Sequence, residues 1–298
     1  MTNRLELNWK VDGFVDEQRY YCSGTPIDPE NLPAPKAILS GDVRSYIDTN
    51  IISDQTYFIR LSSIKNGTEK LSTEIIIVTQ KDQYIQYVVS LIHFLGEDNS
   101  TTIIDIKNKH WLTYGNAKIS KDQSKFGNTS LFLDGNGDYV STPHHADFNM
   151  GAEQFTIECW ARLSTLGTPC FFSKWSATLD RSWALFIPST NQLCFRFWDG
   201  ALIQDVMGAW VPSLNTWHHL AVSKDSNNMI RVFVDGVSIA SAMRVEPVFN
   251  STREVWLGGA RDFPSLDLNG YIDEFRYTKG IGRYQAEFIP PSMPFSDK

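Results

Sequence analysis

The sequence predicts an all-β protein, and three observations support that class. Short runs rich in Val, Ile, Phe, Tyr and Trp alternate apolar with polar residues, as FTIECWARL does over residues 155–163. Turn dipeptides separate these runs, and Asp235-Gly236 joins two of them as a hairpin. The periodicity of an amphipathic helix is nearly absent, so we expect helix to be limited to a turn or two.

Composition and charge narrow the classes of partner. Hydrophobic residues make up 42% and charged residues 20% of the 298 residues, which is typical of a globular protein. The net charge of −7 argues against nucleic acid or an anionic membrane surface as the main partner, because either would select a basic stripe. The opening MTNRLELNWK lacks the pattern of a secretory signal, and the longest apolar stretch, YVVSLIHFL, is too short to cross a bilayer. We therefore expect a product made in a cytoplasm, with no nucleic acid and no membrane as partner.

The four cysteines, Cys22, Cys159, Cys170 and Cys194, have no CxxC spacing. We expect them to be buried and reduced, as small hydrophobic residues are in a reducing compartment. A Cys159–Cys170 disulfide remains open as an alternative.

The residue pattern changes near residue 80. There the segment STEIIIVTQKDQYIQYVVSLIHF contains two strand-like apolar runs separated by the polar QKDQ. We place a domain boundary there. The predicted organisation is a first domain at 1–79, a linker at 80–86 and a second domain at 87–298.

The first domain contains strand-like runs whose spacing fits a compact antiparallel sandwich. These runs are LELNWK, RYYCSG, SYIDTN, TYFIRLSSI and TEIIIVT. With Trp9 in an early strand, Ile51 at the usual leucine position and Tyr57 as the corner tyrosine, the segment resembles a fibronectin type III module. That resemblance implies a spacer or docking unit. The chain has little sequence for a first strand, so that strand is either missing or supplied by another chain.

The second domain carries an ordered set of motifs: STTIIDI, GNAKIS, SLFLDGNGDYV, FTIECWARL, WHHLAVSKD, VFVDG and GYIDEFRYTKGIGRY. In this order they resemble a laminin-G-like, concanavalin-A-like jelly roll, in the version found in bacteriophage tail proteins. The resemblance implies two stacked antiparallel sheets. The first strand (SLIHF) and the last (YIDEFRY) are expected to pair. One departure is HFLGEDNS, where the family usually has an Asp after the Phe.

Asp273 and Glu274 are adjacent acids in the last predicted strand. Adjacent residues of a regular strand point to opposite faces, so these two are poorly placed as a catalytic pair. We expect Asp273 to bond to backbone or a nearby loop, and Glu274 to pair with Arg276 or another base. The resemblance also implies an alternative, a Ca²⁺ site near the sheet ends, with Asp105 and Asp273 as its ligands.

No motif for nucleophilic, phosphate or dinucleotide chemistry is present. There is no G-x-S-x-G elbow and no glycine-rich phosphate loop. The His218-His219 pair lies in a predicted strand, where neighbouring side chains diverge, so a zinc site is disfavoured.

A binding surface is the remaining candidate. If Phe195 and Phe197 face the core, Arg196 and Trp198 point outward. The same alternation turns Trp160 and His219 outward, and neighbouring strands would bring these residues onto one face suited to a sugar ring. The predicted ligand-binding residues are Trp160, Trp175, Asp180, Arg181, Arg196, Trp198, Asp205 and His219. Alternatively, these tryptophans fill a core extension or an oligomer interface.

The resemblance implies a phage tail fibre or tail-associated protein of the virion, made in the host cytoplasm. We expect a non-enzymatic adhesin that binds host surface carbohydrate and contacts other tail proteins, with a trimer as the usual arrangement. Two alternatives stay open: a purely structural tail or baseplate protein, and a polysaccharide-degrading enzyme.

Overall fold

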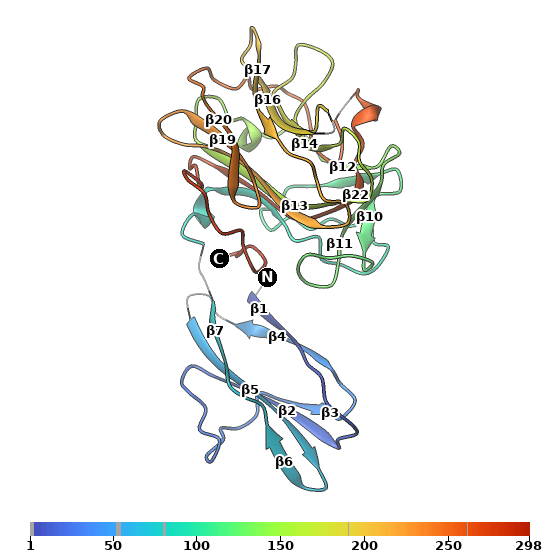
Figure 1. The fold of residues 1–298 in the computed structure, drawn as a ribbon, viewed down its shortest axis with the longest axis vertical. Helices are drawn as coiled ribbons and strands as arrows, with labels where there is room; N and C mark the ends of the chain where they lie inside the picture. The colour runs from blue at the N-terminus through green and yellow to red at the C-terminus, as the bar shows by residue number, and fades with distance from the viewer. Residues whose placement is uncertain (1–2, 52–54, 80–81, 190, 261) are drawn as a thin grey trace. The chain divides into compact units, whose positions relative to one another are not determined.

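The computed structural model describes residues 3–51, 55–79, 82–189, 191–260 and 262–298. The chain divides into two compact units, Met1–Gln83 with Ser296–Lys298, and Tyr84–Phe295 (Figure 1). Strands dominate both, and the described helices are short 3-10 turns. The all-β prediction is therefore confirmed. None of these turns, within the described ranges, has the length and apolar character needed to span a bilayer.

The first unit contains two antiparallel sheets. In the smaller sheet, β1 (Asn3–Asn8) pairs with β4 (Ser45–Ile51). The larger sheet has the order β3-β2-β5-β6, and β7 also pairs with β5. Its strands are β2 (Glu17–Ser23), β3 (Ala37–Ser40), β5 (Gln55–Lys65), β6 (Thr68–Leu71) and β7 (Ile75–Thr79).

Polar bonds hold much of the interior of the first unit. The hydroxyl of buried Tyr20 donates to Asp48 at 2.9 Å, and the Lys36 ammonium pairs with the same carboxylate at 2.6 Å. The indole Nε1 of Trp9 donates to Gln18 Oε1 at 2.6 Å. Buried polar groups need such partners, because an unpaired one would lose its bonds to water without replacement.

The second unit is a jelly roll of two antiparallel sheets. The eight-stranded sheet has the order β10-β11-β22-β13-β18-β19-β20, with β8 on β22. Its strands are β8 (Val88–Ile92), β10 (Lys118–Ser120), β11 (Ser130–Asp134), β13 (Phe155–Leu163), β18 (Trp217–Lys224), β19 (Met229–Val234), β20 (Val237–Met243) and β22 (Asn269–Lys279). The pairing of β8 with β22 confirms the expected closure by the first and last strands.

The seven-stranded sheet has the order β17-β16-β15-β14-β21-β12-β9. Its strands are β9 (Leu112–Tyr114), β12 (Tyr139–Thr142), β14 (Cys170–Ser173), β15 (Trp183–Phe186), β16 (Gln192–Trp198), β17 (Ile203–Ala209) and β21 (Val255–Leu257). The core lies between the two sheets and includes the alternating apolar residues Phe155, Ile157, Phe195 and Phe197. The rings of Phe155 and Phe195 meet across it, 5.8 Å apart.

The segment 281–295 covers the outer face of the eight-stranded sheet. The rings of Tyr284, Phe288 and Phe295 all approach His219 of β18 edge-on, at centroid distances of 6.4, 5.7 and 6.4 Å. Tyr284 and Phe288 also stack on each other at 3.6 Å. This cover buries side chains that the alternation of the strands turns away from the core.

All four cysteines are free, so the alternative of a Cys159–Cys170 disulfide is wrong. Cys159 lies in the core between the sheets, whereas Cys170 packs in a separate cluster with Trp175 and Trp198. Burial raises the pKa of the Cys170 and Cys194 thiols to about 12, which keeps both protonated and unreactive.

Candidate functional site

The predicted single binding face does not form. β13 and β18 are neighbours in the eight-stranded sheet, where Trp160 lies opposite His219. β16, which carries Arg196 and Trp198, belongs to the seven-stranded sheet. These two pairs of residues therefore lie on the outer faces of opposite sheets. The expectation was wrong because alternation gives the face of a strand but not its neighbours.

Trp160 and His219 are covered in this structure. Trp160 is 5% exposed and His219 is fully buried, and their rings meet at 5.2 Å. The Lys125 ammonium lies 3.9 Å above the Trp160 ring. Lys125 therefore covers Trp160, and the segment 281–295 covers His219, so neither residue is open to a ligand in this structure.

A buried charge network lies beneath that segment. Glu158 accepts bonds from Arg276 Nε at 2.9 Å and from the Tyr284 hydroxyl at 2.7 Å, and its other close partner is His219 Nε2 at 3.1 Å. Burial alone would raise the pKa of Glu158, but the charge of Arg276 and the His219 bond outweigh it and hold that pKa well below its usual range. Glu158 is therefore a structural carboxylate, ionised and fully paired.

The adjacent acids Asp273 and Glu274 have the structural partners that we expected. Asp273 Oδ2 accepts from the backbone N–H groups of Lys125 at 2.8 Å and Phe126 at 3.1 Å. Glu274 lies 2.8 Å from His93 Nδ1, so it pairs with a base as expected. Both acids are almost fully buried, which leaves neither at an open cleft.

The assumption of a regular strand at this point was wrong. Glu158 pairs with Arg276 and Trp160 pairs with Asp273, so β22 has one extra residue between these two pairs. The extra residue produces a β-bulge at Glu274, whose φ is +52°. Burial, followed by the nearby negative charge of Glu274, raises the pKa of Asp273 well above its usual range.

Glu158 and Asp273 are expected to give stability opposite dependences on pH. The pKa of Glu158 is lowered on folding, so its stabilisation is present above its unfolded pKa of about 4.3 and is lost as the pH falls further. The pKa of Asp273 is raised, so stability falls as the pH rises from about 4 through its folded pKa. Urea unfolding from pH 3 to 9 should show that Asp273→Asn removes the second dependence and keeps the first. An Asp273→Asn variant with the wild-type profile would contradict this assignment.

The two residues predicted to bind Ca²⁺ accept bonds from different segments. Asp105 accepts from Ser90 Oγ at 2.5 Å, from the Lys107 N–H at 2.6 Å and from Trp111 Nε1 at 3.0 Å. Asp273 accepts from residues 125 and 126. Within the described ranges, no three His, Cys, Asp or Glu side chains gather as a metal site would need. A Ca²⁺ site at Asp105 and Asp273 stays a prediction.

Six of the eight predicted ligand-binding residues lie at the outer face of β14–β17 or in the loops beside it. We call this surface the tryptophan–arginine patch; it consists of Trp175, Asp180, Arg181, Arg196, Trp198 and Asp205. Trp198 ends β16, whereas Trp175 and Arg181 lie in the loop between β14 and β15. Trp175 and Trp198 are only 7% and 9% exposed, because they pack together in one apolar cluster.

Arg181 lies above both tryptophans. Its guanidinium carbon is 4.5 Å from the Trp198 ring centroid and 5.2 Å from that of Trp175. An aromatic face attracts such a cation, so the side chain is held in place. Arg181 nevertheless makes no hydrogen bond or ion pair with any described residue, and its Nε is buried. A positioned guanidinium therefore keeps the four N–H donors of its two Nη atoms for another molecule.

Both acids of the patch, Asp180 and Asp205, already have hydrogen-bond partners within the protein. Arg196 binds Asp205 across β16 and β17 through Nε at 2.8 Å and Nη2 at 2.7 Å. Both side chains remain partly open to solvent, at 32% and 24% exposure. Asp180 accepts from the Thr252 N–H at 2.9 Å and from its hydroxyl at 2.8 Å, which fixes the neighbouring loop.

Sequence reasoning missed two parts of this surface. Phe186 of β15 lies beneath Arg196, with the guanidinium carbon 5.1 Å from its ring centroid. Ile203 lies opposite Trp198 in register and is 43% exposed at the edge of the patch. The alternation of WALF in β15 could have identified Phe186, because Trp183 and Leu185 face the core.

Known proteins share this architecture. Residues 134–280 match the laminin G family model described as the Concanavalin A-like lectin/glucanases superfamily. The binding domain of Paraclostridial Mosquitocidal Protein 1 is similar, with a TM-score of 0.53 and 15% identity over 69% of this chain and 50% of that chain. The binding domain of botulinum neurotoxin serotype D/C gives a TM-score of 0.50 and 14% identity, over 72% and 51% of the two chains.

A weaker similarity, at a TM-score of 0.49 and 20% identity, is to domain 4 of the arabinanase AbnA from Geobacillus stearothermophilus, in complex with arabinotriose; it covers 65% of this chain and 93% of that chain. This chain spans about half the length of the two toxin domains. No curated protein matches it. The second unit is a concanavalin A-like jelly roll, and at these identities the similarity to the toxin domains extends to the fold alone.

Proposed function

We propose that the second unit binds carbohydrate through the tryptophan–arginine patch and does not alter it chemically. The observation that carries the proposal is Arg181, a guanidinium held above Trp175 and Trp198 with no hydrogen-bond partner among the described residues. The match of residues 134–280 to a superfamily described by lectins and glucanases supports a carbohydrate as the ligand.

The chemistry of the patch favours a sugar with strong acceptors. A guanidinium donates two parallel bonds to a carboxylate or to neighbouring hydroxyls, and stacking on indole has already fixed its orientation. The pair formed by Arg196 and Asp205 adds donors and an acceptor that solvent can reach. We therefore expect acidic polysaccharides to bind more tightly than neutral ones.

The acids of the patch do not support hydrolysis. A general acid of a glycosidase needs a raised pKa, so that it carries a proton at working pH. Burial of Asp180 would raise its pKa, but the bonds from Thr252 outweigh burial and lower it. Asp205 is held as the partner of Arg196. Asp273, whose pKa is raised well above its usual range, is fully buried and bonded to the backbone of Lys125 and Phe126.

We propose that the protein works as a phage tail fibre or tail-associated component of the virion that adheres to the polysaccharide of a host cell. Its resemblance to the jelly rolls of phage tail proteins supports this. Several copies in a fibre, a trimer for example, would raise a weak affinity by orders of magnitude. The strand order β3-β2-β5, with β1 paired to β4, supports a fibronectin type III-like first unit that lacks its first strand.

An array of bacterial surface polysaccharides tests the binding. Replacing Arg181 and Arg196 with Ala should weaken binding of the best ligand at least about thirtyfold, because arginines that a bound ligand covers are frequent hot spots worth ~2 kcal/mol. Arg231→Ala is the matched control, since Arg231 also pairs with an aspartate, Asp225, at 2.6 Å but lies on β19 of the other sheet. Unchanged binding by the double variant would remove the patch as the site.

Two further outcomes separate the alternative functions. Release of reducing ends from the bound polysaccharide would indicate an enzyme and contradict the non-catalytic proposal. Failure of the protein to bind any host polysaccharide, or cells that carry it, would favour a purely structural tail or baseplate role.

A further inference from the structure

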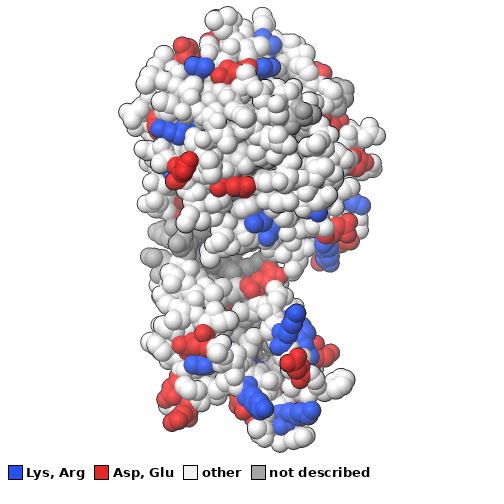
Figure 2. All heavy atoms as spheres, viewed as in Figure 1, with Lys and Arg blue, Asp and Glu red and all other residues white. Residues whose placement is uncertain are grey.

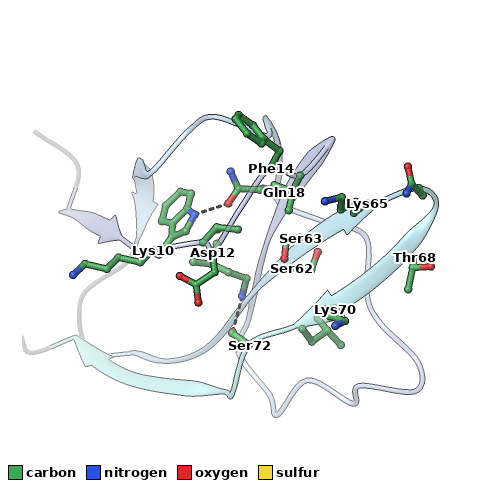
Figure 3. A pocket seen from close by; sticks show the side chains of 16 residues that line it. Lys10, Asp12, Phe14, Gln18, Ser62, Ser63, Lys65, Thr68, Lys70 and Ser72 are labelled. Carbon is green, nitrogen blue, oxygen red and sulfur yellow. Dashed lines mark hydrogen bonds between the residues drawn. The ribbon is translucent and has the colours of Figure 1, made fainter.

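A groove with a volume of about 610 Å³ lies in the first unit. One wall is the segment after β1, which includes Lys10 and Asp12, and the other is the β5–β6 hairpin with Lys65 and Lys70 (Figure 3). The tryptophan–arginine patch of the second unit shares none of these residues.

The groove has an uncompensated positive charge. None of Lys10, Lys65 and Lys70 forms an ion pair or a side-chain hydrogen bond with a described residue, and the carboxylate of Asp12 has no such partner either. Three cations against one anion give the lining of the groove a surplus of positive charge, in a chain whose net charge is −7. On the face of the molecule shown in Figure 2, acidic and basic side chains are otherwise interspersed. The groove therefore favours an anionic occupant.

An open sheet edge runs beside the groove. β6 and β7 both pair with β5 and end the larger sheet on that side, and in the described part of the unit no strand pairs with their outer edge. Ile59 and Ile75 are opposite each other in register, so they share the inner face, yet Ile59 is 1% exposed and Ile75 is 52% exposed. The interior of the sandwich is thus uncovered along this edge.

We propose that this groove and edge bind an extended acidic segment of a partner protein, which adds to β6 as a further strand. Strand addition supplies backbone hydrogen bonds, while every second side chain of the added strand enters the groove. Acidic side chains at those positions meet Lys65 and Lys70. Trp9, fixed by its bond to Gln18, provides an apolar wall, and Phe14, 90% exposed at the rim, gains a surface to pack against.

A polypeptide fits these features better than a glycan does. The unpaired N–H and C=O groups of an edge strand repeat at the spacing of another strand, about 3.3 Å per residue, and template its addition. A glycan could bind the lysines, but it would leave the backbone N–H and C=O groups of the edge strand without regular hydrogen-bond partners. It would also leave Ile75 exposed.

Fluorescence anisotropy with the full chain tests the proposal. The probes are a labelled nine-residue peptide of alternating Glu and Val, its Lys and Val counterpart, and a Glu and Val peptide in which every second amide is N-methylated. The first peptide should bind, and added salt should weaken its binding because the lysines are exposed. The other two should bind at least about tenfold more weakly. Equal binding of the N-methylated peptide, or no binding of the first, would overturn strand addition.

Charge-reversal variants locate the site. Lys70→Glu should weaken the first peptide about tenfold. Lys121→Glu, an exposed lysine of the second unit with the same change in net charge, should leave its affinity unchanged. The Arg181→Ala, Arg196→Ala variant should also bind the peptide normally, which separates this proposal from the proposed carbohydrate site. A Lys70→Glu variant that bound the peptide normally, or that lost only binding of polygalacturonate fragments, would overturn the proposal.

Discussion

Replacing Glu158 with Gln is expected to lower the free energy of unfolding of the second unit by about 3–5 kcal/mol. The carboxylate is fully buried and binds Arg276, which is itself only 6% exposed. Gln keeps the size of the side chain but removes its charge, so the buried guanidinium would lose the carboxylate with which it pairs at 2.8 Å. Breaking one partner of a buried ion pair costs far more than the pair contributes as a whole, because the remaining charge has lost its water.

Chemical denaturation followed by tryptophan fluorescence measures this loss. Asp147→Asn is the control, since Asp147 pairs with Lys109 at 2.6 Å but is 39% exposed, and exposed pairs contribute about 1 kcal/mol or less. A double replacement of Glu158 with Gln and Arg276 with Met should be less harmful than Glu158→Gln alone, because it removes both charges of the pair. Similar losses for Glu158→Gln and Asp147→Asn would contradict the assigned role of the network.

The sequence predicts the layers of this fold better than it predicts the site. Alternation within a strand depends on local geometry, and it correctly assigns Phe155 and Phe195 to the core. The hairpin at Asp235-Gly236 likewise follows from two residues, and the structure pairs Val234 with Val237 around it.

The neighbours of a strand depend on contacts that are distant in the sequence. β13 pairs with β22, more than 100 residues away, and not with β16, which is closer along the chain. This is why Trp160 and Trp198, both turned outward, lie on opposite sides of the molecule. The bulge at Glu274 was hidden for a similar reason, because a positive φ at a non-glycine residue within a strand leaves no trace in the residue pattern.

The cover formed by 281–295 was not predicted either. It buries an outward-facing residue, His219, that the sequence analysis expected to be accessible to a ligand. Trp160 and His219 have the aromatic and polar character of a sugar site. Here His219 packs against Tyr284 and Phe288 of that segment, whereas Lys125 covers Trp160. In the tryptophan–arginine patch, by contrast, Arg196 and Asp205 remain partly exposed, at 32% and 24%. Residue types on an outward face therefore suggest a site only when the rest of the chain leaves that face accessible.

Ending the chain after Lys279 is expected to abolish the cooperative unfolding of the second unit. The segment that is lost supplies the Tyr284 hydroxyl to Glu158 and the Phe295 N–H to Glu274, at 2.7 and 2.8 Å. It also removes the apolar cover from His219. Two buried carboxylates would each lose a donor and an outer sheet face would open to water, at a combined cost comparable to the whole stability of a domain, about 5–15 kcal/mol.

Near-UV circular dichroism and limited proteolysis measure the outcome. Ending the chain after Phe295 is the control, because Ser296–Lys298 group with the first unit and the cover of the second stays whole. A truncated chain that kept its thermal transition would show that the segment is a removable cover. In that case His219 would become accessible, and a gain in polysaccharide binding by the truncated chain would support it as a ligand-binding residue. Loss of the transition would instead establish residues 281–295 as a structural part of the jelly roll, because the charges on the outer face of its sheet depend on that segment for their partners.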